Sequence, residues 1–136
     1  MIDPSYFLFP SPKRTYDVET FPNELFFIPY DLTSASNDPE AHFPAIFLRY
    51  PEARFLILYF HANAEDLGRA YPFLKDLRNE FHSHVMAIEY PGYGICPGRA
   101  TADKVVEQGN ATIRFIRDIL RWPLDSVILL GRSVGE

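Results

Sequence analysis

The chain closes on Leu130-Gly131-Arg132-Ser133-Val134-Gly135-Glu136, directly after the apolar run of residues 126–130. The run has the length and composition of a buried β-strand, and the G-x-S-x-G pattern is typical of a sharp turn from a strand into a helix. Such a turn exposes the serine hydroxyl at the end of the strand, where a substrate carbonyl can reach it. The sequence therefore predicts Ser133 as a nucleophile, and the alternative is a glycine-rich turn without chemistry.

The composition is that of one ordinary folded domain. The chain has 136 residues, of which 47% are hydrophobic and 23% charged, enough for one modest core. The formal net charge is -5, with 13 basic against 18 acidic residues. This balance argues against a nucleic-acid partner, because phosphate binding needs a clustered basic surface. The single cysteine, Cys96, excludes an internal disulfide and any metal site built from several thiolates.

The start of the chain favours a cytoplasmic protein. No apolar stretch approaches the roughly 18 residues of a membrane span, and the first residues lack the basic flank and apolar core of a secretory signal. The second residue is Ile2 rather than Gly, and no cysteine lies near the N-terminus. Neither N-myristoylation nor N-terminal palmitoylation is therefore expected. We predict no transmembrane segment and leave peripheral contact with membranes open.

The N-terminal part is rich in proline and aromatic residues. Residues 25–30 and 45–50 are strand candidates bounded by polar and turn-forming residues, and we expect them to form one antiparallel pair. Because proline cannot donate to an interior ladder, they are expected at the edge of the sheet. Two interpretations remain for the aromatic side chains of this region: core cover, or a patch that docks on lipid. These side chains are Phe7, Phe9, Phe21 and Phe43.

After Phe55, short apolar runs alternate with amphipathic stretches. Residues 55–60, 85–88 and 126–130 are continuous apolar runs, as expected for strands covered on both faces. The first stretch between them has apolar residues at helical spacing, with Pro72 in the opening turn of the helix. Those apolar residues are Ala70, Phe73, Leu74, Leu77 and Phe81.

The second amphipathic stretch predicts a helix from a Thr101 cap to Leu120, stopped by Pro123. The order is then strand, helix, strand, helix, strand. Right-handed crossovers place such strands in a parallel sheet with helices on its faces. The fold class is therefore α/β, with a mostly parallel central sheet, helices on both faces and the antiparallel N-terminal strand pair. Functional loops of such sheets lie at the carboxyl ends of the strands.

Two loops leave carboxyl ends of these strands. One is His61-Ala62-Asn63-Ala64-Glu65-Asp66 and the other is the Ser133 turn. Acyl transfer requires two N–H groups that bind the oxyanion, one from the residue after the nucleophile and one from the loop of an earlier strand. We predict that Val134 and Asn63 supply them. Ala62 is small enough for close backbone approach, and His61 is expected to hold the loop by hydrogen bonds, with a role as general base as the alternative.

Three motifs in this order resemble the α/β-hydrolase fold, and are most similar to the serine hydrolase branch that contains the protein depalmitoylases. They are Phe60-His61-Ala62-Asn63-Ala64-Glu65-Asp66-Leu67-Gly68, Glu89-Tyr90-Pro91-Gly92-Tyr93-Gly94 and Gly131-Arg132-Ser133-Val134-Gly135. The opening Phe9-Pro10-Ser11-Pro12-Lys13-Arg14-Thr15-Tyr16 also resembles that branch. The resemblance implies that residues 1–136 are the N-terminal portion of a single α/β-hydrolase domain, ending just after the nucleophile turn.

The resemblance also implies a function. It predicts a serine hydrolase of esters or thioesters, including fatty-acyl thioesters on proteins, that forms an acyl-enzyme on Ser133 and needs no cofactor. The substrate is then an acylated small molecule or a lipidated protein. The family's oxyanion donors correspond to Asn63 and Val134, and Gly92 and Gly94 match a tight turn that follows a strand.

The chain departs from the family in three ways. Ala62 stands where the family usually has glycine, and the N-terminal cysteines of the depalmitoylases are missing. In this fold the triad acid and histidine follow the nucleophile in chain order, whereas His42, His61, His82 and His84 all precede Ser133. We therefore expect the chain alone to be inactive. The alternative is a non-catalytic, hydrolase-like binding module.

Three other features are weaker candidates for chemistry. His82-x-His84 could place two imidazoles on a metal, although no third ligand is apparent and we predict no metal site. The loop from Gly92 to Gly98 precedes a helix, but its spacing matches no phosphate-binding motif. Cys96 in that loop could act as a nucleophile, although nothing near it in the sequence would lower its pKa.

Overall fold

The structure is a computed structural model, which describes residues 11–131. The described elements are β1 (Leu25–Pro29), the short 3-10 helix η1 (Pro39–Ala41), β2 (His42–Leu48), β3 (Leu56–Phe60), α2 (Leu67–Phe81), β4 (His84–Ile88), α3 (Ala102–Asp118), the 3-10 helix η2 (Leu124–Ser126) and β5 (Val127–Gly131). Each strand and helix expected from the sequence is present, with ends displaced by a few residues.

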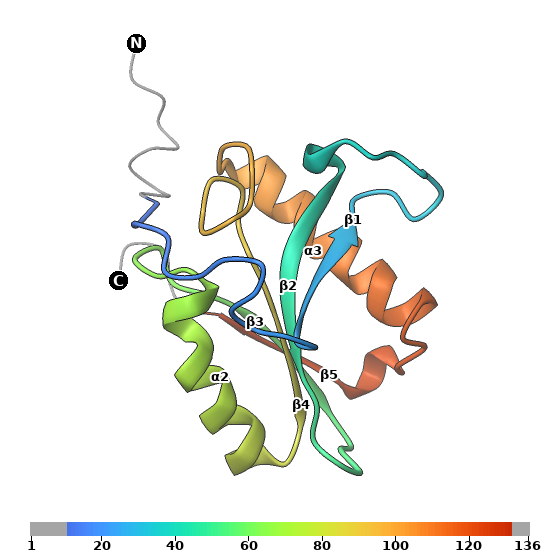
Figure 1. The fold of residues 1–136 in the computed structure, drawn as a ribbon. Helices are drawn as coiled ribbons and strands as arrows, with labels where there is room; N and C mark the ends of the chain where they lie inside the picture. The colour runs from blue at the N-terminus through green and yellow to red at the C-terminus, as the bar shows by residue number, and fades with distance from the viewer. Residues whose placement is uncertain (1–10, 132–136) are drawn as a thin grey trace.

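The five described strands form one sheet in the order β1-β2-β4-β3-β5 (Figure 1). β3 pairs in parallel with β4 and with β5, whereas β2 is antiparallel to both β1 and β4. Among these strands, therefore, only β2 runs against the others. The predicted antiparallel N-terminal pair and the parallel core are both confirmed.

The two long helices cover opposite faces of the sheet. The chain moves from β3 through α2 to β4 on one side, and then returns through α3 to β5 on the other side of β3. Right-handed crossovers in opposite directions put their helices on opposite faces, as Figure 1 shows for α2 and α3. The order thus reverses at β3, and ligands of open α/β sheets bind at the carboxyl ends of strands where such a reversal occurs.

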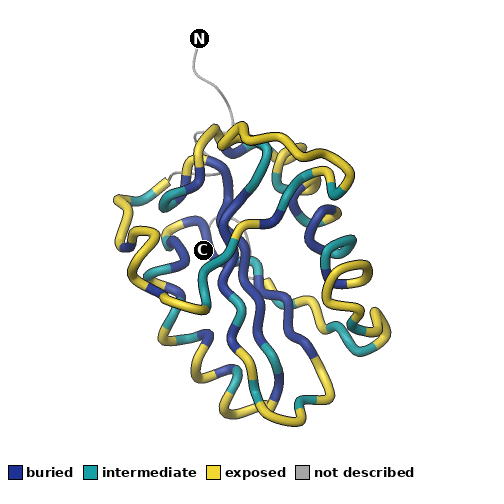
Figure 2. The backbone as a smooth tube through the Cα atoms, turned by 45° about the vertical axis from the view of Figure 1, so that its right-hand side comes forward, coloured by how far each residue is buried: buried dark blue, intermediate teal, exposed yellow. Residues whose placement is uncertain are grey.

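Alternation along β3 explains how both faces become buried. Ile57 and Tyr59 pack in a cluster with Leu74 and Leu77 of α2, whereas Leu56 and Leu58 pack with Ala111 and Ile116 of α3. Successive strand side chains point to opposite faces, so a run of apolar residues serves two cores. Figure 2 shows that the buried residues concentrate in the central strands and that exposed residues follow the outer turns of the helices.

β2 lies inside the sheet, so the expectation that both strands of the proline-rich N-terminal region are edge strands is wrong for it. Its ladder with β4 begins at Ala45, which pairs with Ile88, one residue after Pro44. The Pro44 carbonyl accepts from the N–H of Glu89 at 2.9 Å, and the Glu89 carbonyl, to which Pro44 cannot donate, accepts from the side chain of Gln108 instead. A proline is therefore tolerated in an interior strand at the end of its ladder.

Helix α2 begins earlier than Pro72 suggested. Asp66 caps it by accepting from the N–H of Arg69 at 2.9 Å, and Pro72 lies inside the helix rather than in its opening turn. The contacts of Asp66 and Leu67 with distant residues, described below, fix this early start. The helix ends as His82 takes a left-handed conformation with φ 49°, and the predicted core residue Phe81 is 59% exposed.

Helix α3 begins where the sequence predicted. The Thr101 hydroxyl accepts from the N–H of Lys104 at 3.1 Å, which confirms the cap. The helix ends at Asp118, before Leu120, and the chain leaves it through Arg121 with φ 56°. The turn at Arg121 precedes Pro123, so Pro123 is not what stops the helix.

Two of the four aromatic residues considered for a lipid-docking patch are part of the core. Phe21 and Phe43 are buried, and the other two, Phe7 and Phe9, lie outside the described residues. The interpretation as core cover is thus correct for the pair that can be placed. Within residues 11–131, no helix has the length and apolar character needed to cross a membrane.

Candidate active site

The loop of residues 61–66 leaves the carboxyl end of β3, at the point where the strand order reverses. Glu89 follows β4 at the same edge of the sheet, because β3 and β4 are parallel and end opposite each other at Phe60 and Ile88. β5 ends there as well, with Gly131 opposite Phe60. The predicted nucleophile Ser133 and the predicted donor Val134 lie outside the described residues.

His61 uses both nitrogens of its ring inside the protein. The side chain is fully buried. Nδ1 lies 2.9 Å from the carbonyl oxygen of Ala62, and Nε2 lies 2.7 Å from Oε1 of Glu89. A carbonyl oxygen only accepts, so Nδ1 carries a proton and donates it. Both ring nitrogens are thus engaged, and neither is left to accept a proton from a hydroxyl.

Glu89 is a buried acid at the carboxyl end of β4 whose role the sequence does not predict. Its side chain is fully buried, and its Oε2 accepts from the N–H of Leu67 at 3.0 Å and from the Tyr16 hydroxyl. Buried carboxylates are rare unless they are paired. A lone acid directly after the apolar run of β4 was thus a signal that a partner existed, but only the fold identifies His61 as that partner.

The loop also has its own internal hydrogen bonds. The N–H of Ala62 donates to Oε1 of Glu65 at 2.9 Å, and Oε1 also accepts from the Tyr59 hydroxyl at 2.8 Å. The His61 carbonyl accepts from the Tyr90 hydroxyl at 2.6 Å. The Ala62 N–H is therefore engaged within the loop. The next residue, Asn63, is 7% exposed.

Asp66 fastens the far end of the loop to the N-terminal segment. Its carboxylate accepts from the backbone N–H of Thr15 at 2.7 Å and from the Thr15 hydroxyl at 2.6 Å, in addition to the helix N–H of Arg69. Tyr16, the next residue, reaches Glu89. The segment before β1 thus packs against both carboxylates that hold the N-terminus of α2, where the helix dipole favours negative charge.

Buried tyrosines surround the histidine. The ring centroids of Tyr90 and Tyr93 lie 4.1 and 5.4 Å from that of His61. Burial and the negative charge of Glu89 raise the pKa of Tyr93 to about 12, and the same two causes hold the pKa of Tyr16 far above its ordinary value. The phenols stay protonated at neutral pH, so Tyr16 acts as a donor to Glu89.

The glycines after β4 make the tight turn that the sequence predicted. Gly92 and Gly94 have φ values of 80° and 50°, a region that favours glycine. A Cβ added to Gly94 would lie 2.6 Å from the Tyr16 hydroxyl oxygen and would also collide with the Glu89 carboxylate. Gly94 therefore allows the turn to approach the buried carboxylate closely.

The polar network also includes Gln108 of α3, whose role was not predicted from the sequence. Gln108 is fully buried, and its Nε2 donates to the Glu89 carbonyl at 3.0 Å and to the Tyr30 hydroxyl at 3.1 Å. Its position at helical spacing from Thr112 and Ile116 was the available signal. A polar residue on a buried helix face requires a hydrogen-bond partner.

Cys96 is not an activated nucleophile. Its side chain is 6% exposed, and burial, followed by the charge of Glu89, raises the pKa of its thiol to about 12. Because the thiolate is the reactive form, this thiol is unreactive at neutral pH. In the same loop the N–H of Gly92 donates to the Cys96 carbonyl at 3.1 Å, so it is not directed at a ligand.

The two histidines of the His82-x-His84 pair have separate structural roles. His82 stacks on Tyr50 with ring centroids 5.0 Å apart, and Nδ1 of His84 accepts from the Tyr50 N–H at 3.1 Å. They lie at the amino-terminal end of β4, away from the loop of residues 61–66. Within the described residues, no group of three His, Cys, Asp or Glu side chains could hold a metal ion.

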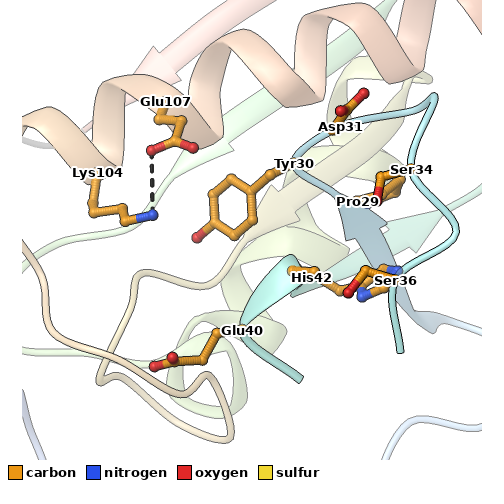
Figure 3. A pocket seen from close by; sticks show the side chains of 10 residues that line it. Pro29, Tyr30, Asp31, Ser34, Ser36, Glu40, His42, Lys104 and Glu107 are labelled. Atoms are coloured by element: carbon orange, nitrogen blue, oxygen red, sulfur yellow. Dashed lines mark ion pairs between the residues drawn. The ribbon is translucent and has the colours of Figure 1, made fainter. Parts of the chain in front are cut away.

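A separate pocket of about 200 Å³ opens between η1, the start of β2 and α3. Figure 3 shows Tyr30 between Lys104 and Glu40, and the ion pair of Lys104 with Glu107, whose closest atoms are 3.3 Å apart. Nζ of Lys104 also lies 4.8 Å from the centroid of the Tyr30 ring. None of the predicted site residues lines this pocket.

Similar sequences are α/β hydrolase domain-containing proteins. The protein aho-3 of Caenorhabditis elegans is 29% identical over 85 residues, which are 62% of this chain and 26% of that protein. The human α/β hydrolase domain-containing protein 17C is 27% identical over 85 residues, which are 62% of this chain and 26% of the human protein. The chain thus spans about a quarter of these relatives. No family model matches it.

Solved structures with the same fold are esterases and serine hydrolase homologues. The esterase of the archaeon Pyrobaculum calidifontis superimposes with a TM-score of 0.61 at 15% identity, covering 82% of this chain and 34% of the esterase. An α/β serine hydrolase homologue from Coxiella burnetii superimposes with a TM-score of 0.61 at 18% identity, covering 88% of this chain and 54% of the homologue. At these identities the likeness concerns the fold.

Proposed function

From the premise that this chain has part of an α/β-hydrolase fold, we propose that the protein is a serine hydrolase that forms an acyl-enzyme on Ser133. The observation that carries the proposal is the pairing of Gly131 with Phe60 in the parallel ladder of β5 and β3. Ser133 is two residues after Gly131, and the loop of residues 61–66 starts one residue after Phe60. A sharp turn at Ser133 would therefore begin beside that loop.

The oxyanion donors in this proposal are the N–H groups of Asn63 and Val134. The N–H of Ala62 donates to Glu65, and the next peptide of the loop after β3 carries the N–H of Asn63, which corresponds to the family's donor from this loop. Two preorganised N–H groups stabilise the charge that develops on the carbonyl oxygen, and loss of one such donor typically costs about 100- to 1000-fold in kcat. His61 and Ala62 support the loop.

The reaction is acyl transfer. Oγ of Ser133 attacks the carbonyl carbon, its proton passes to a histidine, and collapse of the tetrahedral intermediate expels an alcohol or thiol that takes up this proton. Water then cleaves the acyl-enzyme by the same steps. The base is proposed to follow Ser133 in chain order, as in this fold generally, because His61 is committed to Ala62 and Glu89.

The proposed substrates are esters or thioesters, of acylated small molecules or of lipidated proteins that carry a fatty-acyl thioester. The esterases among the structural neighbours support the ester class, and the sequence motifs support the thioester class. A cytoplasmic site of action with peripheral membrane contact suits the second class. Without the triad acid and histidine, the 136-residue chain alone is proposed to be inactive.

The first test labels the complete protein that carries this sequence with a fluorophosphonate, which reacts with activated serines. We expect covalent labelling of the wild type and loss of labelling in Ser133→Ala. Hydrolysis of p-nitrophenyl acetate and of a palmitoylated cysteine peptide would then separate the ester from the thioester substrate. Turnover should fall by at least about 1000-fold in Ser133→Ala.

Ser126→Ala is the matched control and should leave labelling unchanged, because this serine is the last residue of η2, before the amino-terminal end of β5. A folded wild-type protein that neither labels nor hydrolyses either substrate would contradict the proposal. In that case, saturable binding of an acylated ligand without turnover would identify the non-catalytic binding module instead.

A further inference from the structure

Glu89 connects four separate parts of the chain at the candidate site. Its carboxylate contacts His61 of the loop after β3, the first residue of α2, Leu67, and Tyr16 of the N-terminal segment. Its backbone carbonyl accepts from Gln108 of α3. The side chains of Glu89 and His61 are both fully buried, so each of these contacts is made out of water, where an unpaired charge is costly.

The contact of His61 with the loop acts on one peptide group. The His61 Nδ1–H donates to the carbonyl oxygen of Ala62, and the N–H of the same peptide belongs to Asn63. A peptide group is planar and its C=O and N–H point in opposite directions. The hydrogen bond that fixes the Ala62 carbonyl therefore also fixes the direction in which the Asn63 N–H points.

We propose that Glu89 is a positioning residue of the hydrolase, which orients the His61 ring and, through the Ala62 carbonyl, aims the Asn63 N–H at the oxyanion. The role of Asn63 rests on the proposed function; the orientation of the ring by Glu89 does not. Glu89 acts only through His61 in this scheme. It touches no reacting atom.

Without this carboxylate, only the hydrogen bond of Nδ1 to Ala62 would, among the described residues, set the rotation of the imidazole ring about χ2. Tyr90 and Tyr93 pack against the ring, but ring contacts do not choose between its two nitrogens. The 2.7 Å contact of Nε2 with Glu89 makes that choice. It leaves Nδ1 as the nitrogen that faces Ala62, and so selects one orientation of the peptide plane.

The test uses Glu89→Gln in the complete protein. Glutamine has nearly the same shape, and its amide oxygen can still accept from Tyr16 and Leu67. Its uncharged NH2 group then faces Nε2 of His61 and can only donate, so the charge-assisted bond to His61 is lost. A misplacement of about 1 Å can cost about 100-fold in rate, so we expect kcat for p-nitrophenyl acetate to fall about 10- to 100-fold. KM should change by less than about threefold, because the oxyanion forms only in the transition state.

A second variant separates positioning from a general effect on the fold. If Glu89 acts through His61, then His61→Ala combined with Glu89→Gln should be no slower than His61→Ala alone. If the two substitutions instead lower kcat independently, so that their effects multiply in the double variant, the proposal is overturned. So would a Glu89→Gln enzyme whose kcat lies within twofold of the wild type.

Glu24→Gln is the matched control. Glu24 also accepts from a tyrosine hydroxyl, that of Tyr71 at 2.5 Å, but it lies next to β1 and contacts nothing in the loop. We expect its kcat to equal that of the wild type. A parallel fall in both variants would indicate general destabilisation and would overturn the proposal.

Hydrogen exchange of the loop provides a readout that does not need activity. The peptide containing residues 61–66 should exchange faster in Glu89→Gln than in the wild type and in Glu24→Gln, while peptides of β3 and β4 stay protected. Unchanged protection of the loop would refute the positioning role, even in a protein without activity. Absence of fluorophosphonate labelling in the wild type, by contrast, would contradict only the proposed function.

Discussion

Single residues at this site are constrained by their neighbours more than by their own preferences. Glu89 is a charged residue in the core, Gly94 is a glycine next to its carboxylate, and His61 has both ring nitrogens engaged. A buried charge such as that of Glu89 would be unfavourable without its partners. Together these residues form a network in which the Glu89 carboxylate and both nitrogens of His61 are hydrogen-bonded, and such networks rigidify the region that contains them.

Gly94→Ala tests how tightly this network is packed. The new methyl group would collide with the Glu89 carboxylate and the Tyr16 hydroxyl, at a residue with positive φ. Overpacking and backbone strain each cost about 1–3 kcal/mol, so we expect the free energy of unfolding to fall by about 2–4 kcal/mol in urea denaturation of the complete protein.

Gly109→Ala is the control for this substitution. Gly109 lies inside α3, and an added Cβ would come no closer than 3.8 Å to the Phe60 ring. Alanine is favoured over glycine in a helix by about 1 kcal/mol, so this variant should be neutral or slightly more stable. Equal destabilisation of the two variants would contradict the packing described at Gly94.

At the scale of elements, the N-terminus of α2 is the junction that holds the site. Asp66 caps the helix and binds Thr15 at the same time, whereas Thr101 of α3 only caps its own helix. Two helices with the same type of sequence signal thus have different importance for the tertiary structure.

Asp66→Ala should therefore be more costly than Thr101→Ala. Loss of an N-cap alone costs about 1 kcal/mol, which is the expectation for Thr101→Ala. Asp66→Ala also removes the acceptor of the N–H and the hydroxyl of Thr15, and hydrogen bonds to a charged group contribute about 1.5–3 kcal/mol. We expect the free energy of unfolding of Asp66→Ala, measured in thermal or urea unfolding, to fall by about 2–4 kcal/mol. Equal losses in the two variants would refute the role of Asp66 as a junction.

At the scale of the whole molecule, the sheet brings the carboxyl ends of β3, β4 and β5 to one edge and surrounds them with buried phenols. Burial raises the pKa of Tyr16, Tyr90 and Tyr93 above the ordinary value of 10.0. In the unfolded chain these groups ionise near that ordinary value. Folding thus suppresses the ionisation of several groups at once.

The stability of the protein should consequently fall in alkali. Between the unfolded pKa of about 10 and the folded pKa, the unfolded chain binds fewer protons than the folded one, so the free energy of unfolding decreases as pH rises. The stabilisation is fully present below pH 10 and is lost as pH approaches the folded pKa, about 12 for Tyr93. Urea denaturation at several values between about pH 8 and 11 measures this decrease.

Tyr93→Phe should make the free energy of unfolding depend less steeply on pH, because phenylalanine does not ionise. The hydroxyl of Tyr93 has no hydrogen-bond partner among the described residues, so this substitution removes the titrating group without breaking a hydrogen bond. A wild-type protein whose unfolding free energy is constant up to about pH 11 would contradict the burial of these phenols.

The fold follows from local patterns to a considerable extent. The apolar runs of β3, β4 and β5, the Thr101 cap and the turn at Gly92 and Gly94 are all visible in the sequence, because strand period, capping and positive φ depend on residues close in the chain. The loop after β3 could also be identified, because the carboxyl ends of parallel strands share an edge.

What the sequence by itself determined, then, is the α/β class, the parallel core with its antiparallel N-terminal pair, and the loop that begins at His61. Only the tertiary structure decided that β2 is interior despite Pro44, that α2 starts at Leu67 after its cap Asp66, and that His61 meets Glu89. Local preferences act over a few residues, whereas the last of these contacts joins positions 28 residues apart. Such a contact is set by how the strands pair, and pairing depends on the whole sheet.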